Sequence, residues 1–118
     1  MSADWSGGLF PGFYYASIAT SYSTGAITSG GGSDIGGLVG YDGNGSQDIV
    51  DAYWDTTTSG ITNLSQGAGN IANDPGIAGL TTTQLQSGLP SGFSPTIWKE
   101  KSRINGGLPY LVANPPPK

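Results

Sequence analysis

The chain has 118 residues, the length of one domain, and a net charge of −4 from four basic and eight acidic residues. Glycine occupies 21 positions and only 10% of the residues are charged, so an ordinary helix-rich domain is excluded. No basic residue precedes Lys99, which argues against nucleic acid and against anionic membranes as partners. Cysteine and histidine are absent, which excludes disulfides, thiol and imidazole catalysis and the usual zinc sites.

The chain repeats itself. DWSGGL (4–9) aligns with DIGGL (34–38), and IATSYSTGAITSG (18–30) aligns with IVDAYWDTTTSG (49–60). In the first pair of segments, the Gly-Gly-Leu triplets stand 29 residues apart. In the second pair, Ile18 and Ile49 stand 31 residues apart, as do Tyr22 and Tyr53. The unit is therefore about 30 residues long and present twice, and a third, degraded copy is expected to begin at DPGIAGL. A period of this length indicates a solenoid, in which each copy stacks its apolar face on the next.

The repeated segments predict short strands, because they are rich in Ile, Val, Thr and Tyr and are separated by Ser/Gly clusters. Unbroken alternation through 49–55 would bury Asp51 and Asp55, and an unpaired buried carboxylate costs several kcal/mol. We therefore expect a corner between Ile49 and Tyr53 that turns Asp51 outward and leaves strands of two to four residues. Residues 1–80 are predicted to form an all-β, short parallel β-helix, with structural glycines at its corners.

The C-terminal part of the chain does not follow the repeat and predicts other elements. Thr81 and Gln84, placed before Leu85, have the form of a capping box and predict a helical turn that ends at Gly88. The following stretch predicts a β-hairpin with strands at 98–104 and 108–112 and a turn at 105–107.

We interpret residues 81–112 as a cap on the end of the solenoid and 113–118 as a linker or tail. Basic residues would protect the outer edge of the cap from strand addition. Its buried side would consist of Trp98, Leu108, Tyr110 and Leu111.

The glycine-rich stretch GGLVGYDGNG carries no cofactor motif. It lacks the Gly-Lys-Ser/Thr ending of a phosphate loop, and it does not match G-x-G-x-x-G. Acidic and polar residues alternate just after it as in a calcium loop, but no glutamate follows at the twelfth position. We therefore expect no cofactor and no metal, and interpret as a solvated turn the residues Asp42, Asn44, Ser46 and Asp48.

Two functional alternatives remain open. Parallel β-helices host carbohydrate-active enzymes, and Asp34, Asp51 and Asp55 could pair as acid and base. Scattered aspartates make chance proximity easy, so we expect no enzymatic activity. The other alternative is a carbohydrate-binding module, because aromatic residues crowd the N-terminal region and can stack on sugars. Its candidate ligand-binding residues are Trp5, Tyr14 and Tyr15, unless they plug the open end of the first copy.

SYSTGAITSGGGSDIGGLVGYDG resembles the GLUG-motif repeat of large secreted bacterial adhesins of the filamentous haemagglutinin type. YWDTTTSG, GLTTTQLQSGLPSGFSPTIW and GGLPYL resemble the segment that often closes such arrays. The resemblance covers most of residues 6–112, although Phe-Pro-Gly at 10–12 departs from the repeat. It implies a right-handed parallel β-helix, secreted or on the outer surface of a Gram-negative cell, without enzymatic activity.

The resemblance also implies partners. These are a glycan or protein on a host or neighbouring cell, and adjacent repeats of a longer parent chain. End-to-end self-association is a further expectation, because the end of a solenoid exposes unpaired backbone groups. No nucleic acid and no membrane insertion are expected; no run approaches the roughly 18 to 20 apolar residues needed to span a bilayer.

Overall fold

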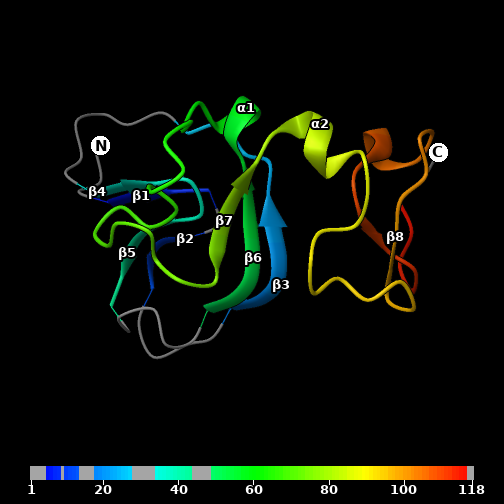
Figure 1. Ribbon diagram of the computed structural model, residues 1–118, viewed down its shortest axis with the longest axis horizontal. Helices are drawn as coiled ribbons and strands as arrows, with labels where there is room; N and C mark the ends of the chain where they lie inside the picture. Colours follow the sequence, from blue (N-terminus) through cyan, green and yellow to red (C-terminus); the bar gives the residue numbers. More distant parts are fainter. Residues whose placement is uncertain (1–4, 9, 14–17, 28–33, 44–48, 117–118) are drawn as a thin grey trace.

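The structure, a computed structural model, describes residues 5–8, 10–13, 18–27, 34–43 and 49–116 (Figure 1). Regular secondary structure in this part of the chain is mostly strand, with three helical segments of three or four residues. The strands are β1 (Trp5–Gly7), β2 (Phe10–Phe13), β3 (Ile18–Ser23), β4 (Asp34–Gly36), β5 (Val39–Asp42), β6 (Ile49–Asp55), β7 (Ile77–Leu80), β8 (Trp98–Lys99) and β9 (Tyr110–Leu111). The helical segments are α1 (Thr56–Ser59), α2 (Thr82–Leu85) and η1, a 3-10 turn (Asn105–Gly107).

The two copies of the repeat pair with each other strand by strand, in parallel. β1 pairs with β4, β2 with β5, and β3 with β6, and β7 extends the last pair to three strands. Ile18 lies opposite Ile49 and Tyr22 opposite Tyr53, while Gly7 lies opposite Gly36. The spacings of 31 and 29 residues read from the sequence are therefore the pairing registers. Figure 1 shows the three groups of strands on three sides of the molecule's N-terminal part.

The third copy begins earlier than the sequence indicated. Leu38 donates its backbone N–H to Gly67 over 2.9 Å, and Val39 forms a parallel bridge with Ala68, so Gly-Ala-Gly at 67–69 follows the second copy's Leu-Val-Gly. DPGIAGL corresponds instead to IVDAYWD, because Ile77 pairs with Ala52. The prediction that the third copy begins at DPGIAGL was wrong: at its true start Ser65-Gln66-Gly67 stands in place of Gly-Gly-Leu, so the signature is absent.

The expected corner has a counterpart in the backbone. Thr20 and Asp51 occupy the same place in β3 and β6, and both have positive φ, at 48° and 50°. Pairing continues on either side of them, so β3 and β6 run for six and seven residues rather than two to four. The bend shifts the alternation, so that Tyr53 faces the C-terminal segment while Trp54 enters the core.

The core gathers residues of all three copies around Trp54. Its fully buried indole donates Nε1–H to the Ile61 carbonyl over 2.9 Å. A Cβ on Gly37 would overlap the ring, and one on Gly79 would stand 2.8 Å from Cζ2. The glycines therefore leave space for a large aromatic ring, a close approach that no other residue permits. The buried cluster consists of Ile18, Leu38, Val39, Ile49, Ala52, Trp54 and Ala68.

Asp55 is fully buried, although the sequence argument treated burial of this carboxylate as unfavourable. One oxygen accepts from the backbone N–H groups of Thr57 and Thr58, and the other accepts from the Thr82 hydroxyl over 2.6 Å. The carboxylate thus caps α1, which the sequence analysis missed, and ties it to α2. Three hydrogen bonds offset the desolvation that an unpartnered carboxylate would suffer.

The capping box is confirmed: the Thr81 hydroxyl accepts from the Gln84 N–H, and the Gln84 side chain accepts from the Thr81 N–H. The helix ends at Leu85 with Gln86 as its C-cap, before the predicted stop at Gly88. β8 and β9 form the expected antiparallel pair, but each has two residues, because Lys101 bridges to Ile104 and η1 follows.

The aromatic residues of the C-terminal segment (81–116) pack on the face of β3 and β6. Phe93 lies 6.2 Å from Tyr22 and 5.8 Å from Tyr53, measured between ring centroids. The Trp98 ring lies 4.4 Å from that of Phe93, and the two rings are tilted by 35°. Tyr22 and Tyr53 donate their hydroxyls to the carbonyls of Pro109 and Ser91, so the equivalent tyrosines of two copies hold one segment.

Of the four residues expected on the buried side of this segment, only Tyr110 is buried. Trp98 and Leu108 are half-buried. Leu111 is 42% exposed, which corrects the prediction, because its neighbour Tyr110 takes the inward position in a two-residue strand. The division into a repeat region (1–80), a cap (81–112) and a tail (113–118) stays a prediction. Among the described residues, no helix is long and apolar enough to traverse a bilayer.

Candidate functional site

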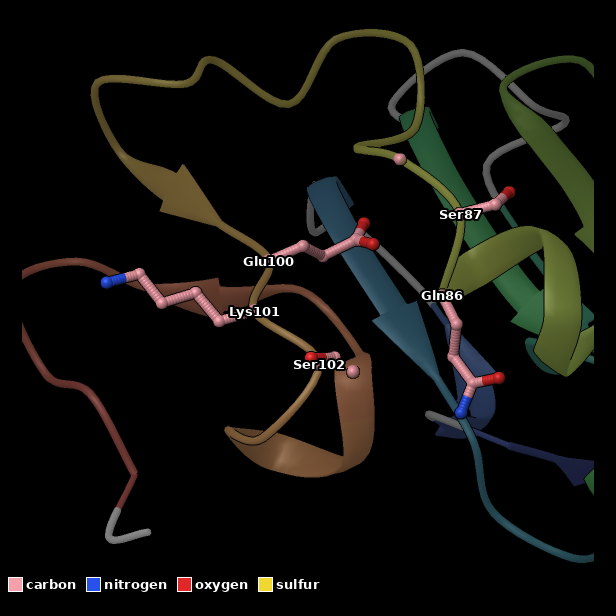
Figure 2. Close-up of a pocket in the computed structure, with 7 residues that line it drawn as sticks. Gln86, Ser87, Glu100, Lys101 and Ser102 are labelled. Carbon is pink, nitrogen blue, oxygen red and sulfur yellow. The ribbon is translucent and has the colours of Figure 1, made fainter.

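A hollow of about 290 Å³ lies between the end of α2 and the loop that follows β8 (Figure 2). Its position follows from local structure: α2 stops at Leu85, so the chain leaves the helix beside the loop at 100–102. Gln86 donates its side-chain amide to the Gly106 carbonyl over 2.8 Å and so links the two walls. The lining is polar apart from the glycines and consists of Gln86, Ser87, Gly88, Glu100, Lys101, Ser102 and Gly107.

Glu100 is the chemically distinctive residue of this hollow. Its carboxylate accepts a backbone hydrogen bond from Gly88, but Oε2 is buried and has no hydrogen-bond partner. Burial raises the pKa of Glu100, and the bond from Gly88 opposes that rise. Figure 2 shows the carboxylate directed across the hollow toward the Ser87 segment, whereas Lys101 points away from it. The site therefore offers a desolvated acceptor that its own lysine does not neutralise.

This acceptor also acts on the neighbouring tyrosine. Burial raises the pKa of Tyr22, the hydrogen bond from Asn105 opposes the rise, and the negative charge of Glu100 adds to it. Asn105 donates to the Tyr22 hydroxyl over 3.3 Å and to the Pro109 carbonyl over 3.1 Å. The wall of the hollow thus continues into the hydrogen bonds that hold the C-terminal segment on β3.

The lining suits recognition of a hydroxyl or amine donor better than bond cleavage. Glycoside hydrolysis uses two carboxyl groups roughly 5 to 9.5 Å apart. Glu100 is the single carboxylate in the lining. Over the described ranges, no three Asp, Glu, His or Cys side chains group as a metal site would require.

The aspartates proposed as an acid–base pair lie elsewhere. Asp55 is buried and engaged as a helix cap. Asp51 is half-buried at the bend of β6, against Gly92, where an added Cβ would overlap the carboxylate. Asp34 starts β4, and its side chain lies outside the described part of the chain.

The predicted ligand-binding aromatics lie largely beyond what the structure describes. The Trp5 backbone pairs with Asp34 in β1, but its side chain, like Tyr14 and Tyr15, is outside the described residues. In the predicted turn at 42–48, Asp42 is buried and its N–H donates to Asn70 over 2.7 Å. Asn44, Ser46 and Asp48 are outside the described residues.

Sequence reasoning missed Glu100 altogether. It stands between two lysines, and such an alternation of charge is typical of a solvated loop. One signal was present, since Glu100 is the only glutamate of the chain. What sets it apart is the backbone of Gly88, which the end of α2 brings to it from 12 residues away.

Comparison with known proteins identifies no relative: the chain matches no protein-family model, no curated protein and no solved structure.

Proposed function

We propose that the chain is a right-handed parallel β-helix, a β-solenoid, acting as a non-catalytic structural and interaction module of a secreted bacterial adhesin. The observation that carries the proposal is the parallel pairing of equivalent strands on three sides, β1 with β4, β2 with β5 and β3 with β6. A chain that advances by one strand spacing per circuit produces this pattern, and separate hairpins do not.

The pattern of burial supports the same function. Stacking buries Leu38, Val39 and Ile49 of the middle copy, whereas charged side chains are few. The side surface of this stack carries few charges, which suits a structural or contact role. The resemblance to GLUG-motif repeats supplies the setting: the outer surface of a Gram-negative cell, and a glycan or protein of another cell as partner.

The test is binding without turnover. Fluorescently labelled chain should bind saturably to cells or to arrayed surface glycans, and the glycans should be recovered unchanged by mass spectrometry. The matched control is Trp54→Ala, which should unfold the stack and abolish binding. Cleaved glycan would overturn the non-catalytic assignment. Absence of binding to every cell and glycan surface would overturn the adhesin assignment while leaving the fold untouched.

A carbohydrate-binding role is the second candidate function, and the polar lining of the hollow, with Glu100 as its acceptor, favours it. Sugar hydroxyls would hydrogen-bond to this lining, in which Ser87, Ser102 and Gln86 provide further polar groups. Calorimetric titration with neutral oligosaccharides should show saturable binding that Glu100→Gln weakens at least about tenfold, the expected loss for a hydrogen bond to a charged group.

Lys99→Gln is the matched control for this titration, because Lys99 adjoins Glu100, is exposed and does not line the hollow. It should leave the affinity unchanged. Equal losses in the two variants would mean that the sugar contacts the outside of the loop, and no loss in either would remove Glu100 from the site.

A further inference from the structure

The three-stranded parallel sheet ends in two open edges. Its strand order is β3-β6-β7, so β3 and β7 each pair on one side only among the described strands. The unpaired N–H and C=O groups of such an edge are a template for another strand. The two open edges are opposite ends of one sheet, and a strand added to β7 would continue the parallel direction that β3 begins.

Neither edge carries the features that usually block strand addition. Natural edges are protected by lysine, proline or a bulge that the partner cannot match. β3 (IATSYS) and β7 (IAGL) contain neither charge nor proline. β3 does bend, at Thr20, but β6 bends at the equivalent Asp51 and the two strands pair on both sides of the bend.

The bend repeats at the far edge of the sheet. Gly76, with φ of 86°, directly precedes Ile77, and Ile77 pairs with Ala52, which directly follows Asp51. Thr20, Asp51 and Gly76 therefore form one row of positive-φ residues across the sheet. A strand that pairs well with β7 must carry the same bend, and β3 carries it.

Apolar side chains are left uncovered at the β7 end. Leu38 and Val39 of the second copy are fully buried because the third copy covers them. In the third copy and the loop before it, Ile61, Ile71 and Ile77 are only partly buried, and Leu64 is 65% exposed beside a hollow that also includes Gly79 of β7. This surface lacks the copy that would complete it.

Charge permits the approach of a like molecule. Although the chain carries −4, residues 61–80 contain one charged residue, Asp74, which is buried. Residues 18–27, which include β3, contain no charged residue. The two ends can therefore meet without like-charge repulsion at short range, and no salt bridge is needed to hold them.

We propose that a second copy of this chain docks head to tail, with its β3 paired in parallel to β7 of the first. The inference rests on the sheet edges and does not depend on the adhesin assignment. The contact is heterologous, since it joins two different edges, so each added molecule leaves a new open β7 and growth does not stop at a dimer.

Sedimentation velocity on the full chain over a wide range of concentration tests this. Wild type should form a series of species that lengthens with concentration. Ala78→Lys on β7 and Ala19→Lys on β3 each place a charge at an exposed position of one edge, and each should leave only monomer. Because every contact uses both edges, the sedimentation of one variant is a sufficient test if the other variant does not fold.

Mixing the two variants gives the decisive result. Ala19→Lys retains an intact β7 edge and Ala78→Lys an intact β3 edge, so the mixture should form a one-to-one complex and nothing larger. Val112→Lys is the control, because Val112 is 40% exposed and belongs to neither β3 nor β7; it should assemble like wild type. A wild type that stays monomeric, a single edge variant that still dimerises, or loss of assembly in Val112→Lys would each overturn the proposal.

Discussion

The Cα of Gly37 lies against the indole of Trp54 so closely that a methyl group on the glycine would overlap three ring atoms. Trp54 is held by its hydrogen bond to the Ile61 carbonyl and is fully buried, so the ring cannot move aside without opening the core. The Gly-Gly-Leu-Val motif therefore serves packing.

Gly37→Ala should destabilise the protein by about 1 to 3 kcal/mol, the range for overpacking a closed core. Gly25→Ala is the matched control, because its nearest side-chain atom would be 3.7 Å from the added carbon. Urea unfolding followed by tryptophan fluorescence measures both. Equal stability of the two variants would show that the core around Trp54 is looser than the contacts indicate.

Asp55→Ala should cost at least about 2 kcal/mol of the free energy of unfolding, since it removes the cap of α1 and leaves the Thr82 hydroxyl without its acceptor. Thr81→Ala removes an exposed cap from α2 and should cost less, about 0.5 to 1 kcal/mol. Chemical denaturation ranks the two. If Thr81→Ala lowered the free energy of unfolding more than Asp55→Ala, the buried carboxylate would destabilise the fold overall.

Tyr22→Phe and Tyr53→Phe should each lower stability by about 1 kcal/mol at pH 7, because each removes a hydroxyl donor from a carbonyl of the C-terminal segment. Burial raises the pKa of both tyrosines in the folded state. Their contribution is therefore complete below about pH 10, the unfolded value, and is lost as the pH rises through the folded pKa. The deficit of the double variant should shrink in unfolding experiments above pH 10, and a deficit that grows there would contradict the assignment.

Glu100→Gln should stabilise the protein at pH 7. Burial raises the pKa of the folded carboxyl, so its contribution is fully present below about pH 4, the unfolded range, and is lost as the pH rises through the folded pKa. Thermal melts from pH 3 to pH 8 should show equal stability at the acid end and a growing advantage of the variant toward neutrality. A wild type that is the more stable protein at pH 7 would show that the Gly88 bond outweighs desolvation.

Much of the parallel pairing could be predicted from the sequence, for a physical reason. Stacked copies place equivalent residues in contact, so Ile18 and Ile49, or Tyr22 and Tyr53, recur at the strand register itself. The capping box of α2 is equally local, since Thr81 and Gln84 supply both hydrogen bonds within one turn. Asp55 before three threonines and Gly60 after Ser59 carried a similar signal for α1 that could have been recognised.

The sequence by itself thus determined the repeat, its register and its predominantly β character, because these depend on residue types at fixed spacing. Only the tertiary structure decided that Asp55 is buried, that Trp54 fills the space left by glycines, that the C-terminal segment lies on the tyrosines of two copies, and that Glu100 keeps an unpartnered oxygen. Each of these depends on a partner brought from elsewhere in the chain: Thr82 for Asp55, Gly37 for Trp54, Pro109 for Tyr22 and Gly88 for Glu100. Burial of a polar or bulky side chain is favourable only when such a partner is in place, and spacing along the chain does not encode which segment will supply it.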